Sequence, residues 1–256
     1  MRFRLLGDMQ AAGAGGRSVD LGHVRQRCVL AVLLIEANHS VPTDQLIDRA
    51  WGDRIPQRAR GTLHTYLSRL RQVLDAVPDV AIVRQHAGYL LAIDPAAVDL
   101  HRFQRLLGRA RAADDESALA LLDEALELWH GEPFATLDTP WLGAVRNDLG
   151  MQRRAAELDR NDIALRRGDH ARILADLSVA AAAQPLDERL TGQLMLAQYR
   201  SGRQSDALDT YRQVRLRLAD DLGTDPSPPL RRLYHRVLTA DPELAAPTHR
   251  NARSNG

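Results

Sequence analysis

Hydrogen-bond donors gather on one side of a helical stretch in the amino-terminal third of the chain. Residues 58–74 read RARGTLHTYLSRLRQVL. At 3.6 residues per turn, one stripe is apolar and consists of Leu63, Leu67, Leu70 and Leu74. The remaining surface and its flanks carry Arg58, Arg60, His64, Thr65, Ser68, Arg69, Arg71 and Gln72. A buried helix needs the leucines, but it does not need this polar side, which has no carboxylate before Asp75. Such donors suit phosphate oxygens and the edges of bases.

These side chains divide by chemistry into two groups. The arginines Arg58, Arg60, Arg69 and Arg71 are candidate phosphate contacts, with Arg84 from the segment that follows. The candidate base readers are His64, Thr65, Ser68 and Gln72. For Arg69 and Arg71, a solvated basic face that binds nothing is the alternative interpretation.

The segments around this helix predict a scaffold that can position it. Residues 79–93 are rich in β-branched side chains and end in Gly88-Tyr89-Leu90-Leu91, which indicates a short hairpin. Upstream, residues 23–37 form an apolar helical run, and a second helix is expected over residues 44–51 with Thr43 as its cap. Short strands are expected at residues 2–8 and 17–21. Three helices between a small sheet and a hairpin predict a winged helix-turn-helix.

The remainder of the chain has a different pattern and predicts an all-α domain. Alanine- and leucine-rich helices are expected at residues 99–113, 115–130, 141–167, 169–183, 186–201, 204–219 and 227–240. Gly168 and Gly202 lie at equivalent points of a weak repeat of 34 residues, the tetratricopeptide period. The predicted fold class is therefore mainly α. Its predicted domains are a winged helix at residues 1–95, a tetratricopeptide-like domain at 96–241 and a disordered tail at 242–256.

Charge and cysteine content narrow the class of protein. The formal net charge is +1, but residues 1–93 contain twelve arginines and eight carboxylates, so this third carries +4. Cys28 is the only cysteine, so no disulfide can form within the chain, as expected for a reducing cytosol. No apolar run approaches the roughly 18 residues that span a bilayer. We expect a cytoplasmic protein.

Catalytic and cofactor motifs are missing from the sequence. The nine histidines are scattered without an HExxH pattern, and no paired cysteines could bind zinc. No Gly-x-Ser-x-Gly nucleophile turn occurs. The glycine-rich residues 11–16 lack the Gly-Lys-Ser/Thr end of a phosphate-binding loop, so they indicate a hairpin loop. We expect neither an enzyme nor a cofactor or metal site.

Motifs along nearly the whole chain resemble the Streptomyces antibiotic regulatory protein family of transcriptional activators. The matching segments are LIDRAWG at 46–52, TYLSRLR at 65–71, GYLL at 88–91, VDLHRF at 98–103, LELW at 126–129, QLMLAQYRSGRQ at 193–204 and DLGTDP at 221–226. The resemblance implies an OmpR-type winged helix followed by a bacterial transcriptional activation domain. It also implies binding to direct repeats near the −35 element of promoters, as a homodimer at least on DNA. The helical domain would recruit RNA polymerase holoenzyme through its sigma and core subunits, usually to switch on a secondary-metabolite gene cluster.

Two other functions remain open on the sequence alone. The helical repeat could make the chain a protein-interaction adaptor, and it could hold a small ligand that regulates DNA binding. Promoter affinity that falls steeply with salt would separate an activator from an adaptor. An apolar pocket with a few convergent polar groups in the helical domain would favour the ligand-responsive reading. A fragment ending near Ile93 should still bind DNA but fail to activate transcription.

Overall fold

The computed structural model describes residues 2–13, 17–75 and 79–246, which form two compact units. Of these described residues, those up to 113 and those at 120–154 make up the first unit, and those at 114–119 and 155–246 make up the second. The border between the units therefore runs through two helices, α5 (Asp115–Glu127) and α6 (Pro140–Arg166). The predicted domain boundary at residue 95 rests on the change of sequence pattern there, and it stays a prediction.

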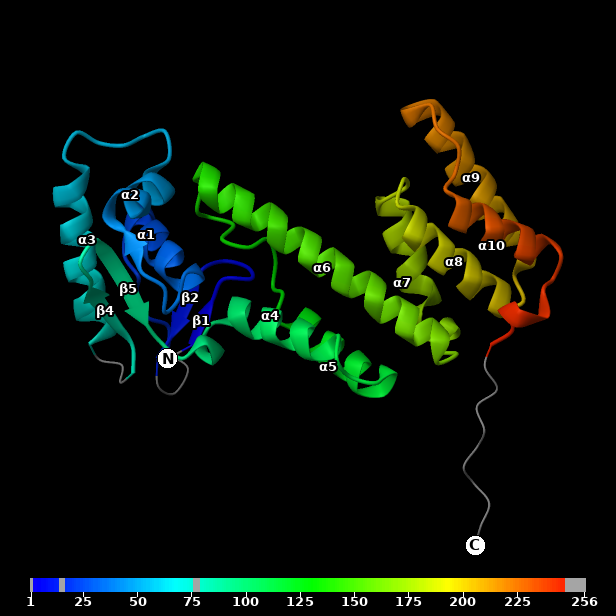
Figure 1. The fold of residues 1–256 in the computed structure, drawn as a ribbon, viewed down its shortest axis with the longest axis horizontal. Helices are drawn as coiled ribbons and strands as arrows, with labels where there is room; N and C mark the ends of the chain where they lie inside the picture. The colour runs from blue at the N-terminus through cyan, green and yellow to red at the C-terminus, as the bar shows by residue number, and fades with distance from the viewer. Residues whose placement is uncertain (1, 14–16, 76–78, 247–256) are drawn as a thin grey trace, which may run out of the picture. The chain divides into compact units, whose positions relative to one another are not determined.

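The amino-terminal part of the first unit is a winged helix-turn-helix. Helices α1 (Val24–Ile35), α2 (Thr43–Trp51) and α3 (Ala59–Leu74) pack together. Strands β3 (Val41–Pro42), β5 (Gly88–Ala92) and β4 (Ala81–Arg84) form an antiparallel sheet in that order. The β4–β5 hairpin is the wing, and it lies beside α3 (Figure 1). The predicted fold class, mainly α with an amino-terminal winged helix, is confirmed.

The first strands differ from the sequence expectation. Strand β1 (Arg2–Arg4) pairs with β2 (Gln10–Ala12), and Ser18 contributes only an isolated bridge to Ala12. The expected strand over residues 2–8 ends early because the backbone N–H groups of Leu5 and Leu6 donate to a side chain, Asp99. Thr43 was expected to cap α2, but it is the first residue of that helix and follows Pro42. Its N–H instead donates to the carbonyl of Ala87 in the wing at 3.1 Å.

Helix α4 (Asp99–Ala110) follows a short 3-10 turn, η2 (Pro95–Ala97). Its first residue, Asp99, is hydrogen-bonded to the residues that follow β1. Its carboxylate accepts the N–H groups of Leu5 at 2.8 Å, Leu6 at 3.1 Å and Leu100 at 2.8 Å. Burial raises the pKa of this carboxyl, although those three donors act in the opposite direction. The first unit therefore extends well beyond residue 95.

Replacing Asp99 by alanine is expected to lower the free energy of unfolding by roughly 2–4 kcal/mol, because it leaves two buried N–H groups without acceptors. Leu5 and Leu6 are both fully buried, so water cannot take over that role. Urea unfolding of the full chain measures the change. The matched control is Asp94→Ala, which removes an exposed capping bond to the N–H of Ala96 and should cost only ~1 kcal/mol. Equal losses of unfolding free energy in the two variants would show that Asp99 does not hold Leu5 and Leu6 in place.

A second segment, at residues 129–134, also contacts the residues that follow β1. His130 donates its N–H to the carbonyl of Leu6 at 2.8 Å, and Phe134 donates to the carbonyl of Gly7 at 2.9 Å. The side chain of Phe134 is fully buried. Trp129, five residues earlier in the chain, packs edge-on against Phe103 of α4 with ring centroids 5.3 Å apart. Trp129 and Phe134 therefore serve packing in this segment.

Helix pairs build the second unit. After the second half of α6 come four helices: α7 (His170–Ala183), α8 (Glu188–Arg200), α9 (Gln204–Leu222) and α10 (Pro228–Leu238). Each of these four packs against the next. Gly168 and Gly202, the glycines of the 34-residue repeat, have φ angles of 85° and 75° in the turns after α6 and α8. These left-handed conformations favour glycine and explain why the repeat is marked by this residue.

The prediction of a disordered tail from residue 242 is wrong for its first residues. Residues Pro242–Leu244 form a 3-10 turn, η3, and the Leu244 side chain is buried in the core of the second unit. Arg200 donates its Nε–H to the carbonyl of Leu244 at 2.9 Å. Residues 247–256, the remainder of that predicted tail, lie outside the described residues.

Candidate nucleic-acid interface

Helix α3 presents the two faces that its sequence predicted. The four leucines of the apolar stripe are at most 1% exposed. The opposite side is exposed and carries Arg60, His64, Thr65, Ser68, Arg69 and Gln72. The helix begins at Ala59, so Arg58 is its exposed N-cap residue and makes no side-chain cap bond. Gly61 lies in the first turn, where its low helix propensity costs less than it would in the middle.

The arginines of this surface are in three different situations. Within residues 2–13, 17–75 and 79–246, the side chains of Arg69 and Arg84 are exposed and have no hydrogen-bond partner. Arg60 lies 2.8 Å from the Asp44 carboxylate of α2, and these side chains are 72% and 77% exposed. An ion pair so exposed contributes little, so a phosphate could replace Asp44 as the partner of Arg60.

Arg71 faces the wing and is only half-exposed. Its Nε–H donates to the carbonyl of Ile82 in β4 at 3.0 Å, and its guanidinium lies 5.9 Å from the ring centroid of Tyr89 in β5. Both contacts tie the wing to α3. The sequence predicted a phosphate contact for Arg71. In the structure, Arg71 also connects α3 to the wing.

The candidate base readers are all exposed, but their polar atoms are not equally free. His64 Nε2 lies 3.3 Å from the Tyr89 hydroxyl, which fixes the orientation of the imidazole. Thr65 donates its hydroxyl hydrogen to the carbonyl of Gly61 at 3.1 Å, so its oxygen is left as an acceptor. Ser68 and Gln72 make no side-chain hydrogen bond with the part of the chain that is described.

Gly88 allows the wing to approach the strand before α2. A Cβ at this position would lie 2.0 Å from the carbonyl oxygen of Val41, which no side chain can tolerate. The turn between β4 and β5 is closed by the N–H of Gln85, which donates to the carbonyl of Gly88 at 2.9 Å. The wing tip consequently exposes Arg84, Gln85 and His86 beside the start of α3.

The aromatic residues of the winged helix are packing residues. Trp51 and Tyr89 are about 5% and 4% exposed. Tyr66 stacks on Trp51 with ring centroids 5.9 Å apart and planes 13° from parallel. Trp51 and Tyr89 are therefore buried too deeply to stack on a single-stranded base, and Tyr66 is half-buried against Trp51.

A shallow polar cleft of about 250 Å³ lies between α3 and the wing. Its lining combines side chains from α2, α3 and the hairpin: Thr43, Asp44, Arg60, His64, Arg84, Gln85, His86 and Tyr89. Sequence reasoning missed Asp44, Gln85 and His86 as members of this surface. The helical wheel of α3 contained no signal for Asp44, because its proximity to Arg60 arises only from the packing of α2 on α3.

In the described part of the chain, no group of three His, Cys, Asp or Glu side chains could hold a metal ion. No helix described here is long and apolar enough to cross a membrane.

Comparison with known proteins gives the family of both halves of the chain. The family model described as bacterial transcriptional activator domain matches residues 98–238. The model described as transcriptional regulatory protein, C terminal, matches residues 16–91, which include α1, α2, α3 and the wing.

Relatives match over almost the full length of the chain. Regulatory protein AfsR of Streptomyces coelicolor is 42% identical over 250 residues, which are 96% of this chain but 25% of AfsR. The chain thus spans about a quarter of that relative. Regulatory protein DnrI of Streptomyces peucetius is 32% identical over 257 residues, or 95% of this chain and 94% of DnrI.

A solved structure has the same fold. Mycobacterium tuberculosis EmbR, in complex with a low affinity phosphopeptide, matches with a TM-score of 0.87 and 36% sequence identity. The match covers 94% of this chain and 65% of the EmbR chain. On these sequence and structural matches, the chain belongs to the Streptomyces antibiotic regulatory protein family of transcriptional regulators.

Proposed function

We propose that this chain binds promoter DNA sequence-specifically and activates transcription by recruiting RNA polymerase. The observation that carries the proposal is the exposed donor stripe of α3 beside the wing. In this arrangement α3 enters the major groove, and the wing tip reaches the adjacent backbone or minor groove. The proposed target is a pair of direct repeats near the −35 element of a promoter for a secondary-metabolite gene cluster.

Phosphate contacts and base contacts come from different parts of this surface. Arg69 and Arg84, which have no protein partner among the described residues, contact phosphates, and Arg60 exchanges Asp44 for a phosphate. Arg58 extends the same contacts at the start of α3, where no side chain caps the helix and the positive end of its dipole also favours an anion. The base edges are read by His64, Thr65, Ser68 and Gln72.

Two copies of the chain and the polymerase complete the proposed assembly. Direct repeats place two winged helices in the same orientation, so each copy reads one repeat. The helical domain at residues 96–241 supports this pairing and contacts the sigma and core subunits of the polymerase holoenzyme. The family membership supports the role in transcription.

Footprinting of the full chain on promoter fragments tests the DNA-binding part of the proposal. Protection is expected over two repeats whose centres are one helical turn apart or a multiple of it. Inserting about five base pairs, half a turn, between the repeats should abolish protection of one repeat, whereas inserting about ten should restore it. Weak binding without preference for any sequence would instead support an adaptor that works through the helical domain.

A further inference from the structure

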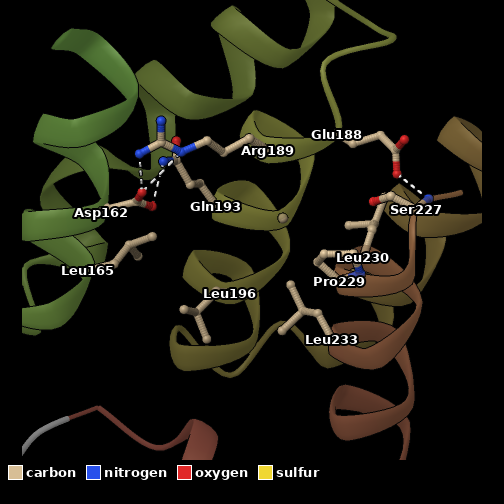
Figure 2. A pocket seen from close by; sticks show the side chains of 11 residues that line it. Asp162, Leu165, Glu188, Arg189, Gln193, Leu196, Ser227, Pro229, Leu230 and Leu233 are labelled. Carbon is tan, nitrogen blue, oxygen red and sulfur yellow. Dashed lines mark hydrogen bonds and ion pairs between the residues drawn. The ribbon is translucent and has the colours of Figure 1, made fainter. Parts of the chain in front are cut away.

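The second unit contains an apolar cavity of about 430 Å³ between α6, α8 and α10. Figure 2 shows its leucines directed into one common space from three helices. These side chains are Leu165 from α6, Leu196 from α8, and Leu230 and Leu233 from α10. The unit has one hydrophobic cluster that contains Leu165 and another that contains Leu230, and Leu196 packs against both, so the cavity lies where the two clusters meet. Its volume falls within the roughly 300–1,000 Å³ that is usual for small-molecule pockets.

A glycine in the middle of α8 keeps this space open. An added Cβ on Gly192 would lie 3.6 Å from Leu233 Cδ2 and 3.7 Å from Leu230 Cδ1, which is ordinary van der Waals contact. Alanine would therefore fit here, and in a helix interior it is favoured over glycine by ~1 kcal/mol. Glycine at this position lowers helix stability without being required by backbone conformation, and its effect is to leave the cavity unfilled.

Charged groups with fixed positions lie along one edge of the cavity (Figure 2). Arg189 donates to Asp159 at 2.6 Å and to Asp162 at 2.5 Å. Gln193 donates to the other oxygen of Asp162 at 2.6 Å, and Glu188 accepts the N–H of Ser227 at 2.6 Å. Of the charged side chains that line the cavity, the carboxylates of Asp162 and Glu188 outnumber the guanidinium of Arg189, which leaves a net charge of −1. Because these groups are already hydrogen-bonded, their positions are set before any ligand arrives.

We propose that this cavity binds a small molecule with an apolar body and one positively charged amine. The body lies among the leucines, and the ammonium group lies at the edge near Glu188 and Asp162. A lining drawn from three helices and a volume of about 430 Å³ favour a small molecule over a protein surface. The proposal is independent of the DNA-binding function, because every residue it uses belongs to the second unit.

Three probes with the same apolar body test both parts of the proposal in the full chain. They are 4-phenylbutylamine, 4-phenylbutan-1-ol and 4-phenylbutyrate, added to protein with ¹³C-labelled leucine methyl groups. The amine is expected to shift the methyl resonances of Leu196 and Leu233 saturably and to bind about fivefold to tenfold more tightly than the acid. Glu188→Gln should reduce that preference. Equal binding of all three probes would overturn the charge assignment.

Variants at the cavity floor locate the site. Gly192→Leu fills the space and should abolish the shifts, whereas Gly150→Leu, at an exposed glycine of α6 with open space around it, should leave them unchanged. Gly192→Ala keeps the helix and should raise the melting temperature while weakening the amine several-fold. If no probe moves these resonances in the unaltered chain, or if the Gly192 variants bind as well as the original, the cavity is not a ligand site.

Discussion

Replacing Arg69 by alanine is expected to weaken operator binding by the full chain roughly tenfold at about 0.15 M salt and to leave the fold intact. The side chain is exposed in the middle of the α3 donor stripe and has no hydrogen-bond partner among the described residues, so its removal breaks nothing in the protein. Each lost phosphate contact should also lower the slope of log K against log salt by about one. Fluorescence anisotropy with a labelled operator over a salt series measures both quantities.

Two further variants show whether the loss is specific to this face. Arg105→Ala removes an exposed arginine of α4 and should leave affinity and salt slope unchanged. Arg71→Ala should weaken DNA binding and also lower the melting temperature, because Arg71 holds Ile82 and Tyr89 of the wing. Our assignment of the recognition helix would be wrong if Arg69→Ala and Arg105→Ala behaved alike.

A fragment that ends at Ile93 is expected to lose cooperative unfolding and operator binding, whereas a fragment that ends at Arg154 keeps both. The shorter fragment lacks Asp99, whose carboxylate accepts the N–H groups of Leu5 and Leu6. It also lacks the fully buried side chains of Phe103 and Phe134. Removing even two such aromatic side chains costs about 3–5 kcal/mol each, against a typical total stability of about 5–15 kcal/mol. This expectation differs from the sequence-based prediction that a fragment ending near Ile93 binds DNA, and the two fragments decide between them.

Circular dichroism melting and operator binding of the two fragments provide the measurement, with the full chain as reference. A cooperative melt of the shorter fragment, together with full operator affinity, would show that the contacts of Asp99 and Phe134 are dispensable. The longer fragment should bind DNA without activating transcription in a reporter assay. Activation by that fragment would show that the part of the helical domain after Arg154 is not needed to recruit the polymerase.

Local periodicity explains what could be predicted. The leucine stripe of α3 recurs every three or four residues, so the sequence alone separated the buried face from the exposed donor face. The turn glycines Gly168 and Gly202 and the β-branched wing are equally local signals. The helices of the second unit therefore appeared near their expected positions, and the fold class followed from the order of the elements.

Contacts between residues far apart in the chain had no such signal. Asp44 reaches Arg60 because α2 packs on α3, and Arg71 reaches Ile82 because the wing folds back. Asp99 meets Leu5 and Leu6 across more than 90 residues, which no spacing rule could indicate. The sequence by itself determined which helix face carries the donors and which family the chain resembles. The tertiary structure decided which of those donors are free, because a side chain's hydrogen-bond partners depend on packing between elements and not on the period of one helix.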